Sequence, residues 1–195
     1  MPRKKREESP TGIYHWITRG MNKKNLFQYP ADYAKFRELI VEYKAAFSIA
    51  VYHYCFMTNH VHMLLHTETL SQLSSFSHYV QRRYAYYYCG KYKWTGSVFQ
   101  RGYRSFVVDR DEYLLECGRY IERNPLKAHL VKTVKNYAHS SYGYYAEERH
   151  DDLVSPSPAY LGLSTNERER RAMYSKFVQE NRVQEEMMER GLLIS

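Results

Sequence analysis

Three histidines interrupt an apolar run near the middle of the chain. In TNHVHMLLH, residues 58–66, they stand at His60, His62 and His66. Alternate side chains of a strand point to opposite faces, so these imidazoles share one face with Leu64 while the remaining apolar side chains share the other. Two imidazoles two residues apart on a strand converge well enough to bind one divalent ion. The same spacing also occurs by chance in histidines with no function. The pattern is therefore compatible with a metal site and with histidines that only line one face of the sheet.

A second polar group could complete a metal site. In RYIERNP, residues 119–125, Tyr120 and Asn124 are four apart and therefore lie on one face of a helix. An amide oxygen is a hard donor of the kind that magnesium or manganese accepts, and a phenol beside it could attack phosphorus. Pro125 biases Asn124 away from helical angles, so we expect the helix to close there.

The composition favours a polyanionic partner. The 195 residues carry a formal net charge of +8, and the pI is near 9.3, as expected for a protein that binds nucleic acid or an acidic membrane surface. The chain has 21 tyrosines against 8 phenylalanines. Tyrosine rings can stack on the bases of a single strand, or can replace phenylalanine at half-buried sites, and the composition alone does not separate the two.

Several other classes of protein are disfavoured. No apolar run approaches the roughly 18 residues that a membrane span needs, and the start MPRKKREESP lacks the apolar core of a signal peptide. We therefore expect a cytoplasmic protein with no membrane partner. Cys55, Cys89 and Cys117 are odd in number and scattered, so neither a disulfide framework nor a CxxC metal site is indicated.

Hydrophobic periodicity predicts a mixed α+β fold. Strands are expected over 12–20, 48–57, 60–67 and 97–108, the last as one strand or a bent pair, and helices over 29–47, 70–92 and 109–124. The order strand, helix, strand, strand, helix, strand, helix is the split βαβ pattern of ferredoxin-like and RRM-like folds, a single antiparallel sheet with helices packed on it. Tyr84 and Tyr88 fall on the apolar face of the second helix and are expected in the core.

The last part of the chain is expected to stand apart from this unit. Residues 151–164 are rich in proline and serine and indicate a linker. Beyond them, Ser164 and Glu167 fit a capping box that opens a final helix extending to Val183. This pattern divides the chain into a main domain, 1–150, and a linker with a C-terminal helix, 151–195.

Four motifs in matching order give the chain a family resemblance. YHWITRGMNK, NHVHMLL, GSVFQRGYRS and RYIERNPLKAHLV, together with the SSY of residues 140–142, resemble the REP-associated tyrosine transposases, a branch of the single-tyrosine HUH transposases (IS200-like). The resemblance runs from Tyr14 to Tyr142. It implies that residues 1–150 form an HUH catalytic domain that cleaves and rejoins single-stranded DNA beside hairpins such as REP-like elements, leaving a 5′-phosphotyrosine and a free 3′-hydroxyl.

The resemblance also implies roles for individual residues. His60 and His62 match the HUH pair, Tyr120 matches the nucleophile, and Asn124 holds the position of a further ligand to Mg²⁺ or Mn²⁺, often glutamine in relatives. A free phenol has a pKa near 10 and needs a base or a positive field at neutral pH, and no such group is identified by the sequence. His66 shares the face of the pair but lies outside the matched motif.

Candidate DNA contacts surround these motifs. They are Arg19, Asn22 and Lys23 after the first strand, Arg83 on the second helix, and Gln100, Arg101, Tyr103 and Arg104 on the fourth strand. Basic side chains hold phosphates while rings stack on bases. The alternative for each charge is a solvated surface position, which we favour less for the arginines inside the matched motif.

Two further functions fit the same features less fully. An RRM-like module binds single strands without catalysis, with histidines that stack or hydrogen-bond. A transposase relative that binds DNA but has lost activity is intermediate between the two. By resemblance we expect a prokaryotic protein near the nucleoid, acting as a monomer or a homodimer.

Overall fold

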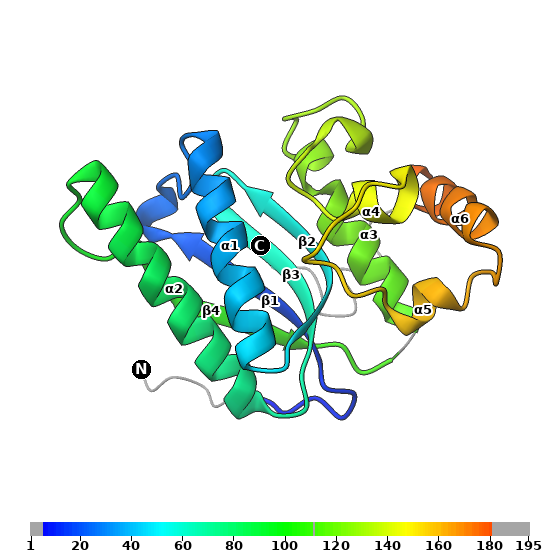
Figure 1. The fold of residues 1–195 in the computed structure, drawn as a ribbon, viewed down its shortest axis with the longest axis horizontal. Helices are drawn as coiled ribbons and strands as arrows, with labels where there is room; N and C mark the ends of the chain where they lie inside the picture. The colour runs from blue at the N-terminus through cyan, green and yellow to red at the C-terminus, as the bar shows by residue number, and fades with distance from the viewer. Residues whose placement is uncertain (1–5, 111, 181–195) are drawn as a thin grey trace.

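Four antiparallel strands form the centre of the fold (Figure 1). The computed structural model describes residues 6–110 and 112–180. The strands are β1 (Ile13–Gly20), β2 (Ala50–Met57), β3 (His60–His66) and β4 (Phe99–Val107). They are arranged in the order β2-β3-β1-β4, with every neighbouring pair antiparallel. This is the predicted ferredoxin-like sheet, and the expected fold class is confirmed.

Two helices cover the face of the sheet that carries Trp16 on β1 and Val61, Met63 and Leu65 on β3. These are α1 (Pro30–Ala46) and α2 (Leu70–Tyr92). Tyr84 and Tyr88 are buried in this first core, as predicted. The Tyr84 hydroxyl donates to the carbonyl of Leu26 (2.7 Å), so burial leaves its polar atom paired.

The third helix, α3 (Glu112–Lys127), packs on the opposite face, mainly against β2 and then β3. It continues through Pro125, so the prediction that it closes at Asn124 is wrong. Proline has no N–H for the carbonyl of Ile121, four residues earlier. The Asn124 side chain compensates, because Nδ2 donates to that carbonyl (3.2 Å) and to the carbonyl of Tyr120 (2.9 Å).

The later segments pack around α3 and β2. They are η2 (Val134–Asn136), α4 (Tyr142–Glu147), α5 (Pro158–Leu161) and α6 (Glu167–Gln179), and the short η1 (Met21–Lys23) follows β1. In the described part of the chain, no helix is long and apolar enough to cross a membrane.

The segment 151–164, expected as a linker, is bound to the sheet and to α1. Ser155 N–H donates to the carbonyl of Val51 (2.8 Å), and Arg37 pairs with Asp151 and Asp152. Its proline and serine residues therefore make a packed turn and the short α5. The division at residue 150 stays a prediction.

The start of α6 also differs in detail from the expected capping box. Asn166, and not Ser164, caps the helix, because its side chain accepts from the N–H of Glu169 (3.0 Å). Ser164 bonds the Glu169 carboxylate instead. Val183, expected in this helix, lies outside the described residues.

A buried polar cluster fixes α3 against β2. The Glu122 carboxylate on α3 lies 3.1 Å from Nδ1 of His53 on β2 and accepts from the hydroxyls of Ser141 (2.6 Å) and Tyr174 on α6 (2.9 Å). All four side chains are buried. Gly118, one turn before Glu122, faces the His53 ring, where a Cβ would lie only 2.7 Å from the imidazole. The helix therefore approaches β2 closely because residue 118 has no side chain.

We expect Tyr174→Phe to lower the free energy of unfolding by about 1–2 kcal/mol, because a buried carboxylate oxygen loses a donor. Urea denaturation followed by circular dichroism measures the change. Tyr79→Phe is the matched control, since that ring is 44% exposed on α2 and should change stability by less than about 0.5 kcal/mol. Equal effects of the two variants would show that the Tyr174 hydroxyl does not stabilise the α3 cluster.

Candidate functional site

His60 and His62 lie side by side at the start of β3, on the face of the sheet that α3 partly covers. On β1, their cross-strand partners are Arg19 for His60 and Ile17 for His62. The ring centroids of the two histidines are 4.9 Å apart and the rings are nearly perpendicular. Strand alternation therefore places both imidazoles on one face, as the sequence predicts.

The Nδ1 atoms of both histidines are hydrogen-bonded within the protein. Nδ1 of His60 lies 2.6 Å from Oδ1 of Asn59, and Nδ1 of His62 lies 3.0 Å from Nε2 of His15 on β1. Asn59 Oδ1 can only accept, so the His60 proton is on Nδ1 and its Nε2 carries a free lone pair. His62 offers Nε2 to a cation in the tautomer whose Nδ1–H donates to His15.

Burial keeps these imidazoles neutral. Desolvation, followed by the charge of Arg19, lowers the pKa of His60 to about 4. Desolvation and the neighbouring His15 and His60 hold the pKa of His62 well below its usual value. Desolvation alone lowers the pKa of His15 to about 3. A metal-binding histidine must be neutral, so the electrostatics of the pair suit a ligand role at neutral pH.

Tyr120 on α3 faces this row of histidines. Its ring centroid lies 6.0 Å from that of His62 and 5.8 Å from that of His15, with both pairs edge to face. Desolvation raises the pKa of the half-buried phenol above its ordinary value of about 10. Tyr120 is thus protonated at neutral pH and, as a nucleophile, requires a neighbouring group that favours loss of the proton.

Asn124 lies one helical turn after Tyr120. Its Nδ2 is committed to the carbonyls of Tyr120 and Ile121, which leaves Oδ1 as the atom available to a cation. Among the described residues, no three His, Cys, Asp or Glu side chains come together as a metal site. The amide oxygen of Asn124 is a donor of the kind that Mg²⁺ or Mn²⁺ accepts, and neutral imidazoles are common ligands of divalent metal ions.

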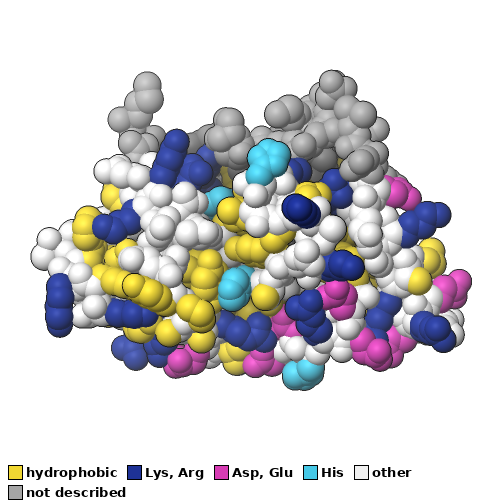
Figure 2. Space-filling view, turned by 90° about the horizontal axis from the view of Figure 1, so that it is seen from above, with side chains coloured by type: hydrophobic (Ala, Val, Ile, Leu, Met, Phe, Trp, Pro, Cys, Tyr) yellow, Lys and Arg dark blue, Asp and Glu magenta, His cyan; other side chains and the backbone are white. Residues whose placement is uncertain are grey.

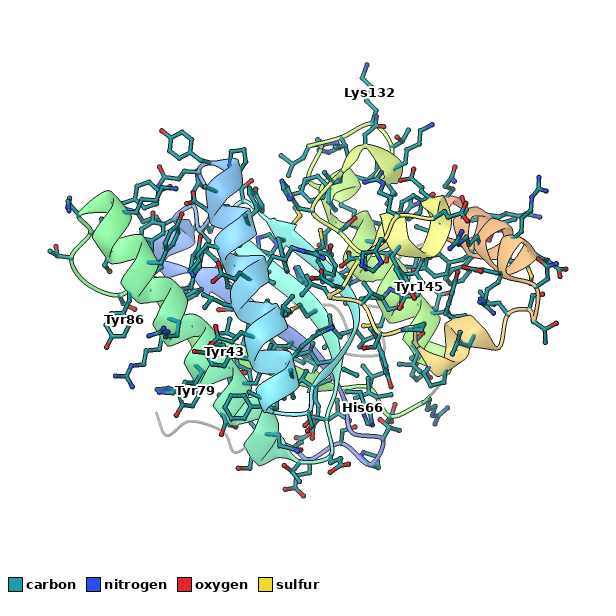
Figure 3. The ribbon with its side chains drawn as sticks, in the orientation of Figure 1. Tyr43, His66, Tyr79, Tyr86, Lys132 and Tyr145 are labelled. Atoms are coloured by element: carbon teal, nitrogen blue, oxygen red, sulfur yellow. The ribbon has the colours of Figure 1, made fainter. Side chains whose placement is uncertain are left out.

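His66 is at the far end of β3 and takes no part in this arrangement. Its ring stacks on Tyr52 with centroids 6.0 Å apart, beside the turn at Gly12. Figure 3 shows His66 at the lower end of the sheet. Sharing a face with His60 therefore does not bring the two histidines together.

Several predicted DNA contacts lie near the histidine pair. Arg19 is exposed and directly opposite His60. Arg104 is exposed and in register with Ile17, which places it on the histidine face, with its guanidinium 5.2 Å from the Phe106 ring. The exposed Asn22 and Lys23, at the end of β1, have left-handed φ angles, and Gln100 is exposed at the start of β4.

Other predicted contacts are elsewhere. Tyr103 is buried on the opposite face, where its ring stacks on Trp16 and its hydroxyl lies 2.9 Å from that of Ser74. The expectation that this ring stacks on a base is contradicted, because Tyr103 and Arg104 are adjacent in a strand and must point to opposite faces. Arg83 is on α2, on the helical layer opposite the histidines. The side chain of Arg101 lies outside the described residues.

Two residues of the site were missed by the sequence reasoning. His15 belongs to the quoted YHWITRG segment, and strand alternation in that segment could have indicated it. Lys127 has its Nζ 4.1 Å from the centroid of the Tyr120 ring. It was missed because the helix was expected to end at Asn124, three residues earlier.

The sequence between residues 9 and 124 matches the family model described as "Transposase IS200 like". The chain belongs to the IS200-like transposase family. The resemblance drawn from the motifs is thus confirmed at the level of the family. No curated protein matches the chain.

Two solved structures are similar to this member of the transposase family. A REP-associated tyrosine transposase bound to a REP hairpin has 16% sequence identity, covers 80% of this chain and 93% of its own, and superposes with a TM-score of 0.65. This likeness shows a shared fold. A candidate transposase from Deinococcus radiodurans is 13% identical over 70% of this chain and 98% of its own, and its TM-score of 0.43 supports no argument.

We expect His15→Leu to weaken Mn²⁺ binding by about 10- to 100-fold, because the variant loses the group that fixes the His62 ring and tautomer. Isothermal titration calorimetry of the DNA-free protein measures the affinity. His66→Leu, at the far end of the sheet, should leave it unchanged. If His15→Leu melts at the wild-type temperature and binds Mn²⁺ equally well, then His15 does not support a metal ligand.

Proposed function

We propose that this transposase cuts and rejoins single-stranded DNA beside hairpins, through a covalent bond between Tyr120 and a 5′-phosphate. The observation that carries the proposal is the position of the Tyr120 ring, whose centroid lies 6.0 Å from that of the His62 ring in the same chain. The phenol proposed as the nucleophile thus faces His62 of the histidine pair, in a member of a transposase family.

The residues of the site divide the chemistry between them. His60, His62 and the Asn124 amide oxygen would hold Mg²⁺ or Mn²⁺, which when bound supplies charge stabilisation at a non-bridging phosphate oxygen. Tyr120 forms the bond to phosphorus as the bond to the 3′-oxygen breaks. Arg19, opposite His60, and Arg104, on the same face, would hold the DNA backbone nearby.

The DNA substrate is proposed from charge and from the relative. The solved REP-associated transposase is described as bound to a REP hairpin. Figure 2 shows the end of the molecule seen from above, where acidic side chains gather along the lower edge and at the right while basic ones are spread over the face. Arg19 and Arg104 are exposed on the histidine side of the sheet, and Asn22, Lys23 and Gln100 are exposed at the strand ends, which suits a polyanion that reaches this side.

The placement of Tyr120 also bears on assembly. Because Tyr120 lies beside its own His62, one chain supplies both the nucleophile and the histidine pair. We therefore propose a site that acts in cis, whether the protein is a monomer or a homodimer. We also propose that it acts on DNA in the prokaryotic cytoplasm.

The first test is covalent capture of DNA. We expect the wild-type protein, incubated with labelled single-stranded hairpins and Mn²⁺, to give a protein–DNA adduct on a denaturing gel, and chelator to abolish it. Tyr120→Phe should reduce the adduct by at least about 10³-fold, because the attacking oxygen is absent, while DNA affinity stays within a few-fold. Tyr86→Phe, an exposed tyrosine on α2, should behave as wild type.

The metal ligands are tested in the same assay. His60→Ala and His62→Ala should each abolish the adduct without preventing DNA binding, because both positioning and charge stabilisation depend on them. DNA binding by the wild-type protein without any adduct, with or without metal, would contradict the proposal. It would instead favour a recognition module or an inactive transposase.

A further inference from the structure

Lys127 is the last residue of α3 and lies two helical turns after Tyr120. Its Nζ is 4.1 Å from the centroid of the Tyr120 ring, close enough for a cation–π contact. This position depends on the passage of α3 through Pro125, which the Asn124 side chain stabilises. The same helix therefore presents both the nucleophile and a cation that lies over its ring.

Among the described residues, Lys127 differs from two other lysines that pair with carboxylates. Lys35 pairs with Glu38 and Lys91 with Asp32. Within the described part of the chain, no carboxylate is at ion-pair distance from Lys127. A half-buried cation without a counter-ion is unfavourable on its own and would be stabilised by an anion that forms or binds beside it.

The surroundings of Lys127 also orient it towards the site. Desolvation, followed by repulsion from Arg123 and Arg119, lowers the pKa of Lys127 to about 8, so the ammonium is still the main form at pH 7. Those two arginines are directed away from Tyr120, because they donate to the backbone of α6 and the residue after it. The charge of Lys127 also reaches His62, whose pKa it lowers.

A charge at this position suits the chemistry proposed for Tyr120. A phenol that attacks phosphorus develops negative charge on its oxygen, and the Tyr120 ring is half-buried. A fixed positive charge at a low-dielectric site stabilises a developing anion far more than it would in water. Among the described residues in contact with the Tyr120 ring, Lys127 is the one that carries such a charge.

We propose that Lys127 is a catalytic residue of the strand-cleavage step, whose ammonium stabilises the negative charge that develops on Tyr120 as it attacks phosphorus. The inference rests on the proposed function. In this step the phenol proton passes to solvent and the phenol oxygen forms the bond to phosphorus. The bond from phosphorus to the 3′-oxygen breaks, its electron pair leaves with that oxygen, and the oxygen takes a proton from solvent. Lys127 keeps its protons throughout.

The test compares variants that keep or remove the charge. We expect Lys127→Met, which preserves the length of the side chain, to slow adduct formation in single-turnover assays by about 10²-fold. Lys127→Arg should stay within about 10-fold of wild type. Lys132→Met is the matched control, because Lys132 is exposed beyond the end of α3 and projects away from the fold (Figure 3). It should react at the wild-type rate.

A second measurement separates charge stabilisation from a structural role. Fluorotyrosine introduced at position 120 has a more acidic phenol and depends less on a nearby cation. In the Lys127→Met background it should raise the rate of adduct formation at least 10-fold over Lys127→Met alone. In the wild type it should change that rate little. The melting temperature of Lys127→Met should not fall, because the substitution removes an unpaired, partly desolvated charge.

The outcomes distinguish this inference from the function on which it rests. A wild-type rate for Lys127→Met, in a protein that forms the adduct, would overturn the role of Lys127 and leave the proposed function intact. A slow Lys127→Met that fluorotyrosine does not restore would also overturn it. Failure of the wild-type protein to form an adduct would overturn the proposed function, and the role of Lys127 with it.

Discussion

The close packing of α3 on β2 decides where the chemistry of this protein can occur. A buried glutamate on α3 meets a buried histidine on the sheet, and the missing side chain at Gly118 lets the two elements approach. A buried carboxylate is tolerated only when its oxygens are hydrogen-bonded, and here donors come from Ser141 and from Tyr174 on α6. The C-terminal helix thereby helps to hold the helix that carries Tyr120.

The two faces of the sheet have different tasks. The face under α1 and α2 is a continuous apolar core, which gives the strands a rigid frame. The other face is only partly apolar, with a smaller core under α3 around Leu64 and Ile121 and the histidines beyond it. Polar side chains at the edge of a packed core are both fixed in position and desolvated. Desolvation therefore lowers the pKa values of His60 and His62, which keeps both side chains in the neutral form that metal binding requires.

Much of this arrangement could be predicted from the sequence, because strand alternation and helix periodicity are local properties. They placed His60 and His62 on one face and Tyr84 and Tyr88 in the core. Two predictions about the site were wrong: the end of α3 at Asn124 and the exposure of Tyr103. The first depends on a side chain that replaces a backbone hydrogen bond, and the second on how two strands pair. Asn124 replaces the hydrogen bond that Pro125 removes, so α3 extends to Lys127. Tyr103 and Arg104 are adjacent in β4 and so point to opposite faces of the sheet. The register of β4 on β1 shows that Arg104 lies on the side of the histidines and Tyr103 on the side of the core.

The central claim is that α3 presents Tyr120, among 21 tyrosines, to the histidine pair of its own chain. The most direct test is to isolate the covalent protein–DNA complex, digest both components, and locate the attached nucleotide by tandem mass spectrometry. The account predicts that the nucleotide is attached to the peptide that contains Tyr120, through a phosphate ester of the phenol. Attachment to any other tyrosine would contradict it, whatever the yield of the complex.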